Sequence, residues 1–139
     1  MNKLVLLDTH IWIWLINGDK RVRSKFFLRS LNQAVNRSAV RVSVISIWEV
    51  AMLESKGRIQ FPSGCWEWIR QAIHAPGISL AELTPEIAFE STRISKDILT
   101  DPADQMIVVT AKCLKAQLVT LDKNILSFAK SMNLSALSP

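Results

Sequence analysis

The feature that most constrains this chain is a short apolar run, Leu4 to Leu7, that ends abruptly at Asp8. A continuous run of this length is typical of a strand buried on both faces, as in a parallel sheet. Two further segments have strand character: residues 40–44 alternate valine with a polar residue, and residues 118–121 are apolar apart from one threonine. We therefore expect a sheet built around these three segments.

Predicted helices alternate with these strands. Residues 9–17 are apolar on all sides, which predicts a buried helix ending at Asn17-Gly18. Ser46 to Glu49 has the form of a capping box, and Thr84-Pro85 and Asp101-Pro102 each join an N-cap to a first-turn proline. The other expected elements are helices near 22–31, 63–76 and from 124, and strands over 78–83 and 134–137. This order predicts an α/β fold, one domain over 1–139 with a central, mostly parallel sheet flanked by helices.

Composition excludes several classes of protein. Hydrophobic residues make up 49% of the chain and charged residues 21%, a balance typical of a folded domain and not of a disordered tail. The longest unbroken apolar run, Ile11 to Ile16, is far shorter than the ~20 residues needed to cross a bilayer. Cys65 and Cys113 cannot form a disulfide framework. We expect a cytoplasmic protein with no membrane segment.

Acidic residues stand where the predicted strands end. Asp8 and Asp122 directly follow two of the strands, Glu49 lies just past a third, and Asp104 lies in the first turn of a predicted helix. Ligands of open parallel sheets bind beyond the carboxyl ends of the strands. If the fold brings four carboxylates together, a hard cation such as Mg²⁺ or Mn²⁺ must balance their charge. A cation held in this way can activate water for attack on a phosphodiester.

Most of these acids also have a purely structural explanation. Glu49 closes the predicted capping box, and Asp122 could cap the helix that follows it. Asp101 suits the N-cap before Pro102, and Asp104 would then complement the helix dipole. Asp8 is the hardest to explain structurally, because it ends a buried strand and precedes an apolar helix. Spacing alone leaves both interpretations open.

Four segments, taken in order, resemble the motifs of the PIN-domain family. The resemblance is greatest to VapC-type ribonuclease toxins of bacterial type II toxin–antitoxin pairs, and it runs from end to end of the chain. It implies a PIN-like fold, a divalent-metal site, endoribonuclease activity and an antitoxin partner. The segments that carry it are Leu6 to His10, Ser46 to Ala51, Asp101 to Asp104 with Ile107 to Ala111, and Leu118 to Asp122.

The resemblance also assigns roles to individual positions. Thr9 and Thr120 match positions where a hydroxyl supports the metal site. Gln105 departs from the family pattern, because arginine is usual there. Asp8 and Asp104 match the principal metal ligands. The acidic quartet of the family is matched by Asp8, Glu49, Asp104 and Asp122.

Charge and aromatic content indicate the partners. The net charge is +5, and residues 20–41 hold seven Lys and Arg and no acid, which suggests phosphate binding, although a solvated helix face is the simpler explanation. Five tryptophans in so short and apolar a chain predict a homodimer, a state the resemblance also implies. The tryptophans could stack on bases, but packing in the core or against a partner is the preferred interpretation.

The sequence thus predicts a Mg²⁺- or Mn²⁺-dependent endoribonuclease that acts on RNA as the toxin of a toxin–antitoxin pair. Two alternatives stay open. One is a PIN-like module that binds RNA or a protein without cleavage, although such a module would have no need of four mutually repelling acids. The other is a metal-dependent phosphatase or DNA nuclease of similar geometry.

Overall fold

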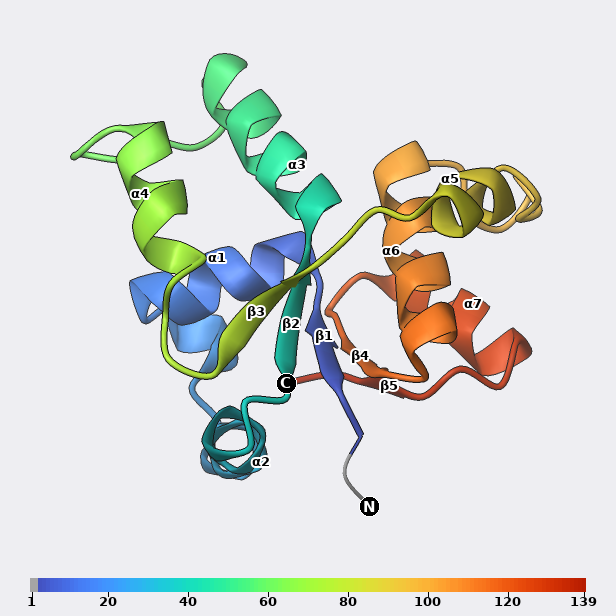
Figure 1. Cartoon of the computed structure of the whole chain (residues 1–139), viewed down its shortest axis with the longest axis horizontal. Helices are drawn as coiled ribbons and strands as arrows, with labels where there is room; N and C mark the ends of the chain where they lie inside the picture. The colour runs from blue at the N-terminus through green and yellow to red at the C-terminus, as the bar shows by residue number, and fades with distance from the viewer. Residues whose placement is uncertain (1–2) are drawn as a thin grey trace.

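The computed structural model describes residues 3–139. Five short strands form one sheet in the order β3-β2-β1-β4-β5, and every neighbouring pair is parallel. This confirms the predicted α/β fold with a parallel central sheet (Figure 1). The strands are β1 (Val5–Leu7), β2 (Val40–Ser43), β3 (Ile78–Ala81), β4 (Gln117–Val119) and β5 (Ala136–Leu137).

Helices fill the connections between the strands. Within residues 3–139, none of them has the length and apolar character needed to cross a membrane. They are α1 (Thr9–Asn17), the short 3-10 turn η1 (Lys20–Val22), α2 (Lys25–Asn36), α3 (Val44–Ser55), α4 (Cys65–Ala72), α5 (Pro85–Ser91), α6 (Pro102–Leu114) and α7 (Lys123–Ser131).

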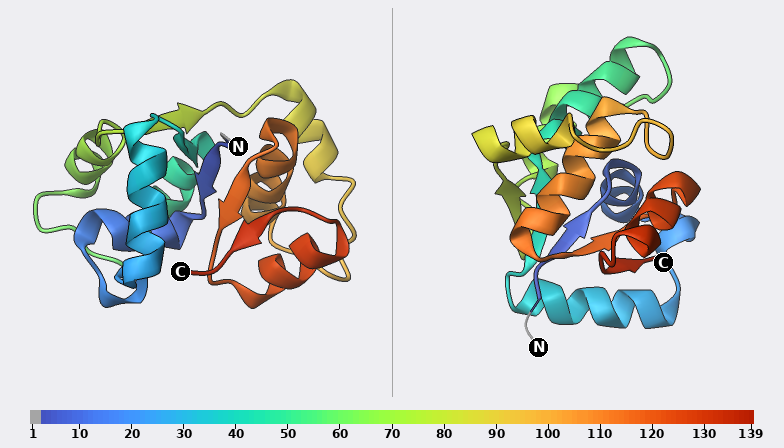
Figure 2. Two further views of the ribbon diagram at one scale, coloured as in Figure 1. Left: turned by 90° about the horizontal axis from the view of Figure 1, so that it is seen from below. Right: turned by 90° about the vertical axis from the view of Figure 1, so that its right-hand side faces the viewer.

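The two faces of the sheet are covered by different helices. Successive strand residues point to opposite faces, so neighbours in β1 enter different cores. Leu7 packs with residues of α1, α2 and α4, whereas Leu6 packs with residues of α6 and α7. Val119 and Leu118 divide in the same way in β4. The ribbon views show the helices on the two sides of the sheet (Figure 2). The continuous apolar run at the N-terminus is explained by this burial on both faces.

Three local start and stop signals behave as the sequence predicts. Gly18 ends α1 in the left-handed conformation, with φ of 68°, and its N–H donates to Leu15 O and Trp14 O. Asp101 caps α6 and Thr84 caps α5, each directly before a first-turn proline. Each signal acts within one turn of backbone, which is why the sequence suffices to locate it.

The predicted capping box from Ser46 to Glu49 is wrong. The helix begins earlier, at Val44, because the hydroxyl of Ser43 accepts a hydrogen bond from the N–H of Ile45 at 3.1 Å and serves as the N-cap. The strand correspondingly ends at Ser43, its last residue paired with β3. Ser46 and Glu49 therefore lie within α3, three residues apart on one face.

The order of the strands creates a switch point between β1 and β4. From β1 the chain moves outward through β2 to β3, and it then returns past β1 to β4 and β5. Leu7 pairs with Val119, so β1 and β4 end at the same level. Ligands of open α/β sheets bind in the crevice at such a point. The residues that follow these two strands are thereby brought side by side.

Candidate metal centre

Five carboxylates line one pocket of about 430 Å³. The fold brings together all four acids of the predicted quartet, although they come from different elements: one follows β1, one lies in α3, one in α6 and one after β4. Asp101, for which the sequence indicated only a capping role, joins them. The lining residues are Asp8, His10, Ile11, Trp14, Glu49, Asp101, Asp104, Leu121 and Asp122.

Asp8 is buried and held by both of its oxygens. Its Oδ1 accepts a hydrogen bond from the backbone N–H of Thr9 at 2.8 Å, which makes it the N-cap of α1. Its Oδ2 accepts from the hydroxyl of Thr120 at 2.7 Å. The Thr120 oxygen in turn accepts from the N–H of Asp122 at 3.0 Å. Asp8 thus has a capping role that the sequence did not reveal, and the threonine after β4 fixes its orientation.

Thr9 performs the corresponding task for Glu49. Its hydroxyl donates to Glu49 Oε1, and the hydroxyl of Ser46 lies 2.8 Å from the same threonine oxygen. Ser46 and Glu49 reach it together because α3 begins at Val44 and presents both on one face. The corrected start of α3 is therefore what gives Glu49 its place beside the first strand.

The start of α6 supplies two more carboxylates. Asp101 Oδ1 accepts from the N–H of Asp104 at 3.0 Å, which confirms the predicted N-cap. Carboxylate oxygens of Glu49, Asp101 and Asp104 lie within 4.8 Å of one another. Because a carboxylate has two oxygens, capping leaves one of those on Asp101 for a cation. The signal in the sequence that could have revealed Asp101 as a member of the cluster was its spacing of three residues from Asp104, which places both acids at the first turn of α6.

Asp8 and Asp122 line the same pocket outside this group of three. Asp122 caps α7, its Oδ1 accepting from the N–H of Ile125 at 3.0 Å. The structural and functional interpretations of the acids are therefore compatible: three of the five cap helices, and all five line the pocket.

Burial, with a further contribution from neighbouring carboxylates, raises the pKa of three of these acids. Burial raises the pKa of Asp104 to about 8, and the charges of Asp101, Asp8, Glu49 and Asp122 add to the shift. Burial likewise raises the pKa of Glu49 to about 7, although the Thr9 hydrogen bond opposes it. The pKa of Asp8 is raised by burial, against the effect of its hydrogen bonds and of His10.

The donor set fits a hard divalent cation. All of the clustered groups are carboxylates, the ligands preferred by Mg²⁺ and Mn²⁺. Among the described residues that line the pocket, His10 is the only side chain that can carry a positive charge. A cation between Glu49, Asp101 and Asp104 would balance the charge of these carboxylates and offset the mutual repulsion that adds to the raised pKa values of Glu49 and Asp104.

Gln105 stands where the resemblance leads one to expect arginine. It does not line the acidic pocket. It is buried, and its Nε2 donates to Leu99 O at 2.6 Å. That bond ties the first turn of α6 to the segment just before Asp101. The glutamine therefore helps to position the acids through the backbone.

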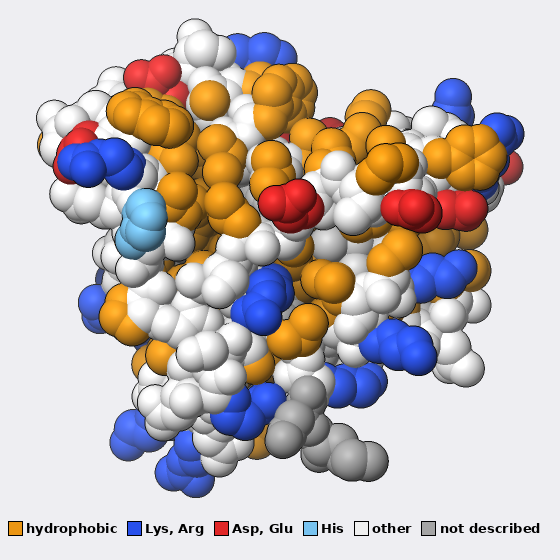
Figure 3. Space-filling model, viewed as in Figure 1, with side chains coloured by type: hydrophobic (Ala, Val, Ile, Leu, Met, Phe, Trp, Pro, Cys, Tyr) orange, Lys and Arg blue, Asp and Glu red, His pale blue; other side chains and the backbone are white. Residues whose placement is uncertain are grey.

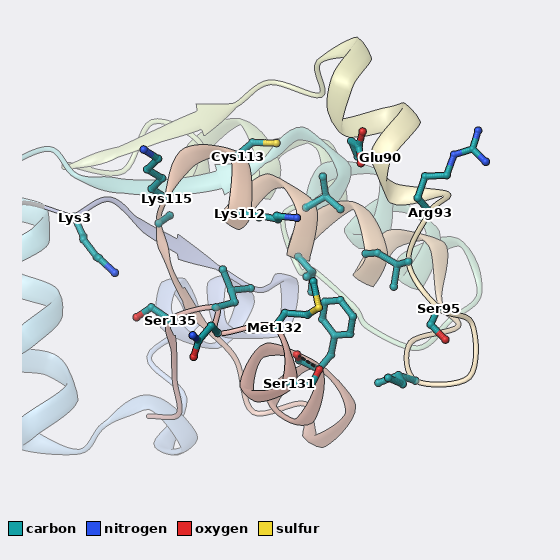
Figure 4. Close-up of a pocket in the computed structure, with 18 residues that line it drawn as sticks. Lys3, Glu90, Arg93, Ser95, Lys112, Cys113, Lys115, Ser131, Met132 and Ser135 are labelled. Carbon is teal, nitrogen blue, oxygen red and sulfur yellow. Dashed lines mark hydrogen bonds between the residues drawn. The ribbon is translucent and has the colours of Figure 1, made fainter.

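A larger cavity of about 810 Å³ lies elsewhere, between α6, α7 and the segment after α5. Its walls are mostly apolar, with Lys3, Lys112 and Lys115 among the labelled side chains around it (Figure 4). Of the acids among residues 3–139, Glu90 lines it and the five clustered acids do not. The chemistry of the side chains, and not the volume, distinguishes the smaller pocket as the candidate site.

Comparison with known proteins agrees with this geometry. No curated protein matches the chain in sequence. Among solved structures, VapBC2 from Rickettsia felis, bound to a DNA fragment from its promoter, has a chain with 15% identity and a TM-score of 0.70, covering 97% of this chain and 98% of that one. FitAcB from Neisseria gonorrhoeae has 15% identity and a TM-score of 0.62, with 96% of each chain covered.

A toxin–antitoxin complex from Klebsiella pneumoniae has 20% identity and a TM-score of 0.55, covering 85% of this chain and 86% of that one. At these identities the likeness concerns the fold. The family is given by the sequence itself, since the model of the PIN domain matches residues 5–131, from the first strand to the last helix. By this match the chain belongs to the PIN domain family.

Proposed function

We propose that this protein is a Mg²⁺- or Mn²⁺-dependent endoribonuclease. The observation that carries the proposal is the convergence of five carboxylates at the switch point of the sheet, three of which have oxygens within 4.8 Å of one another. In this proposal Asp8 and Asp104 are the principal metal ligands, and Glu49 and Asp122 complete the quartet. Asp101 is a further ligand or near neighbour of the cation.

The roles of the side chains follow from their contacts. When bound, a divalent cation would activate water and stabilise negative charge on the phosphoryl group. Thr120 holds the carboxylate of Asp8, and Thr9 holds that of Glu49, so that both face the pocket. With a cation bound, the carboxylates would hold it and orient a water for attack on the phosphorus. We propose that the exposed Lys and Arg of residues 20–41, none of which lines the pocket, contact the RNA backbone beyond it.

The biological role that we propose is that of the toxin in a bacterial type II toxin–antitoxin pair, acting in the cytoplasm. Support comes from membership of the PIN family and from the toxin–antitoxin complex that shares the fold. The cognate antitoxin would insert an apolar helix and place a basic side chain near the acids. A structure of the complex with the antitoxin far from Asp8 and Asp104 would contradict this part of the proposal.

Cleavage of a panel of structured RNAs with Mn²⁺, Mg²⁺ or EDTA tests the activity. Cleavage should require the divalent cation and be lost in the Asp8→Ala protein. Metal-independent cleavage that persists in this variant would contradict the proposal. RNA binding without cleavage under any of these conditions would instead identify a binding module.

A further inference from the structure

One tryptophan stands apart from the others because it lines the acidic pocket. Trp12 is buried and packs edge-on against Trp68, with 5.0 Å between ring centroids, so both belong to the core. Trp14 lies on the same helix but is only partly buried and forms part of the pocket wall with His10. The ring of His10 lies 5.6 Å from that of Trp14. An aromatic surface therefore adjoins the carboxylates.

An arginine lies over the ring of this tryptophan. The guanidinium carbon of Arg21 lies 4.2 Å from the centre of the Trp14 ring. Asp19 fixes it through two hydrogen bonds, from Nε to Oδ1 at 3.0 Å and from Nη2 to Oδ2 at 3.1 Å. The N–H of Asp19 donates to Trp14 O at 2.8 Å, so the turn after α1 is tied to the tryptophan itself.

Arg21 remains accessible to solvent in this arrangement. The side chain of Arg21 is 58% exposed in spite of its three fixed contacts. Guanidinium planes and aromatic rings are the surfaces on which proteins stack unpaired nucleic-acid bases. The carboxylate of Asp19 already balances the charge of Arg21, so what the pair offers a ligand is a flat, pre-oriented surface more than a net positive charge.

We propose that Arg21, stacked on Trp14, forms a subsite for an unpaired base of RNA next to the phosphodiester held at the acids. The inference rests on the proposed nuclease function and deepens it, because it names single-stranded RNA as the form bound beside the cut. A base within a duplex is already stacked on both faces and cannot use the platform. The subsite therefore selects loops and unpaired segments.

The test compares binding of a short fluorescent single-stranded RNA of random sequence with binding of the corresponding duplex. Both are measured by polarisation on the Asp104→Asn protein, so that cleavage does not interfere. Arg21→Lys keeps the charge and removes the plane, and it should weaken single-strand binding about tenfold, the loss of one stacked base. Duplex binding should be unchanged. The ratio of the two affinities is insensitive to any fraction of protein that is unfolded.

Two arginines provide matched controls. Arg70 is equally exposed, at 59%, and pairs with Glu67, and Arg93 lies over the ring of Phe89 at 4.6 Å. Their partners Glu67 and Phe89 do not line the acidic pocket, whereas Trp14, the partner of Arg21, does. Arg70→Lys and Arg93→Lys should leave the ratio of affinities unchanged.

An unchanged ratio of single-strand to duplex affinity in Arg21→Lys would overturn the subsite. The contact of Arg21 with Trp14 would then serve fold stability or the binding of a protein partner. Cleavage by the unsubstituted protein with Mn²⁺ is measured separately. A lost preference for single strands in Arg21→Lys supports the subsite even if no RNA is cleaved, in which case only the nuclease proposal fails.

Discussion

At the scale of single residues, the structure gives Asp101 and Asp104 overlapping tasks. Both lie in the pocket, but Asp101 also caps α6. Asp104→Asn should abolish cleavage and Mn²⁺ binding. Asp101→Asn should cost only a few tenths of a kcal/mol in stability, since Asn caps about as well as Asp. Its Mn²⁺ affinity should fall, though by less than that of Asp104→Asn, because one anion of the cluster is lost.

Calorimetric titration with Mn²⁺ and an RNA cleavage assay on both variants check this prediction. If Asp101→Asn abolished activity while Asp104→Asn spared it, the principal ligand would have been assigned to the wrong acid.

The raised pKa values predict how the metal-free protein responds to pH. Asp104 and Glu49 have pKa values of about 8 and about 7 in the folded state, against ordinary values of 3.8 and 4.5. The folded state therefore binds more protons than the unfolded state between these limits, and its stability must fall as pH rises from about 4 to about 8. Melting in EDTA across this range measures the effect.

Asp104→Asn is the informative variant in this experiment. It removes the carboxyl whose pKa is raised to about 8 and one source of repulsion, so its melting temperature should fall less steeply with pH and exceed that of the unsubstituted protein near pH 8. A steeper fall than in the unsubstituted protein would contradict the assignment of these shifts.

At the scale of elements, two serines near the start of α3 have different roles, one in the stability of the helix and the other in the acidic site. Ser43 caps the helix, whereas Ser46, three residues on, contacts Thr9 beside Glu49. Ser43→Ala should destabilise the fold by about 1 kcal/mol through loss of the cap and leave Mn²⁺ affinity unchanged. Ser46→Ala should weaken Mn²⁺ binding, because Thr9 is then less firmly held. Denaturant unfolding and Mn²⁺ titration of the two variants test this prediction. A loss of Mn²⁺ affinity confined to Ser43→Ala would contradict it.

The segment from η1 through α2 predicts the salt dependence of RNA binding. Most of the Lys and Arg of residues 20–41 are exposed, and Lys and Arg side chains surround α2 at the bottom of the space-filling view (Figure 3). Neutralising about three phosphates would give a slope of log K against log[salt] near −2 for a single strand. Binding of the Asp104→Asn protein at several salt concentrations measures the slope. A flat response would mean that these side chains only solvate the helix.

At the scale of the whole molecule, exposed apolar side chains predict a homodimer. Trp48 on α3 and Phe89 on α5 are each 56% exposed, and Leu80 lies on β3, the edge strand of the sheet. Figure 3 shows apolar side chains gathered over α3 and α4 and again over α5. A patch of this kind is typical of an interface between proteins.

Light scattering at micromolar concentration should therefore give the mass of two chains. Trp48→Glu should give a monomer, whereas Phe26→Glu on α2, a side chain that is 74% exposed, should not. A strictly monomeric unsubstituted protein would refute the prediction.

The sequence by itself determined the elements and their local chemistry. The run ending at Asp8, the glycine after α1 and the Asp101-Pro102 cap each act within a few residues, so they can be recognised without the fold. Local signals also misled: the spacing of Ser46 and Glu49 fits a capping box, but the cap formed at Ser43, where pairing with β3 ends.

Only the tertiary structure decided which residues meet. The contact of Thr120 with Asp8 spans 112 positions, and it depends on β1 lying beside β4 with Leu7 opposite Val119. The same applies to Glu49 beside Thr9, and to Asp101 as a member of the cluster as well as a cap. Strand order and register are set by burial on both faces of the whole sheet, a property that no single segment carries.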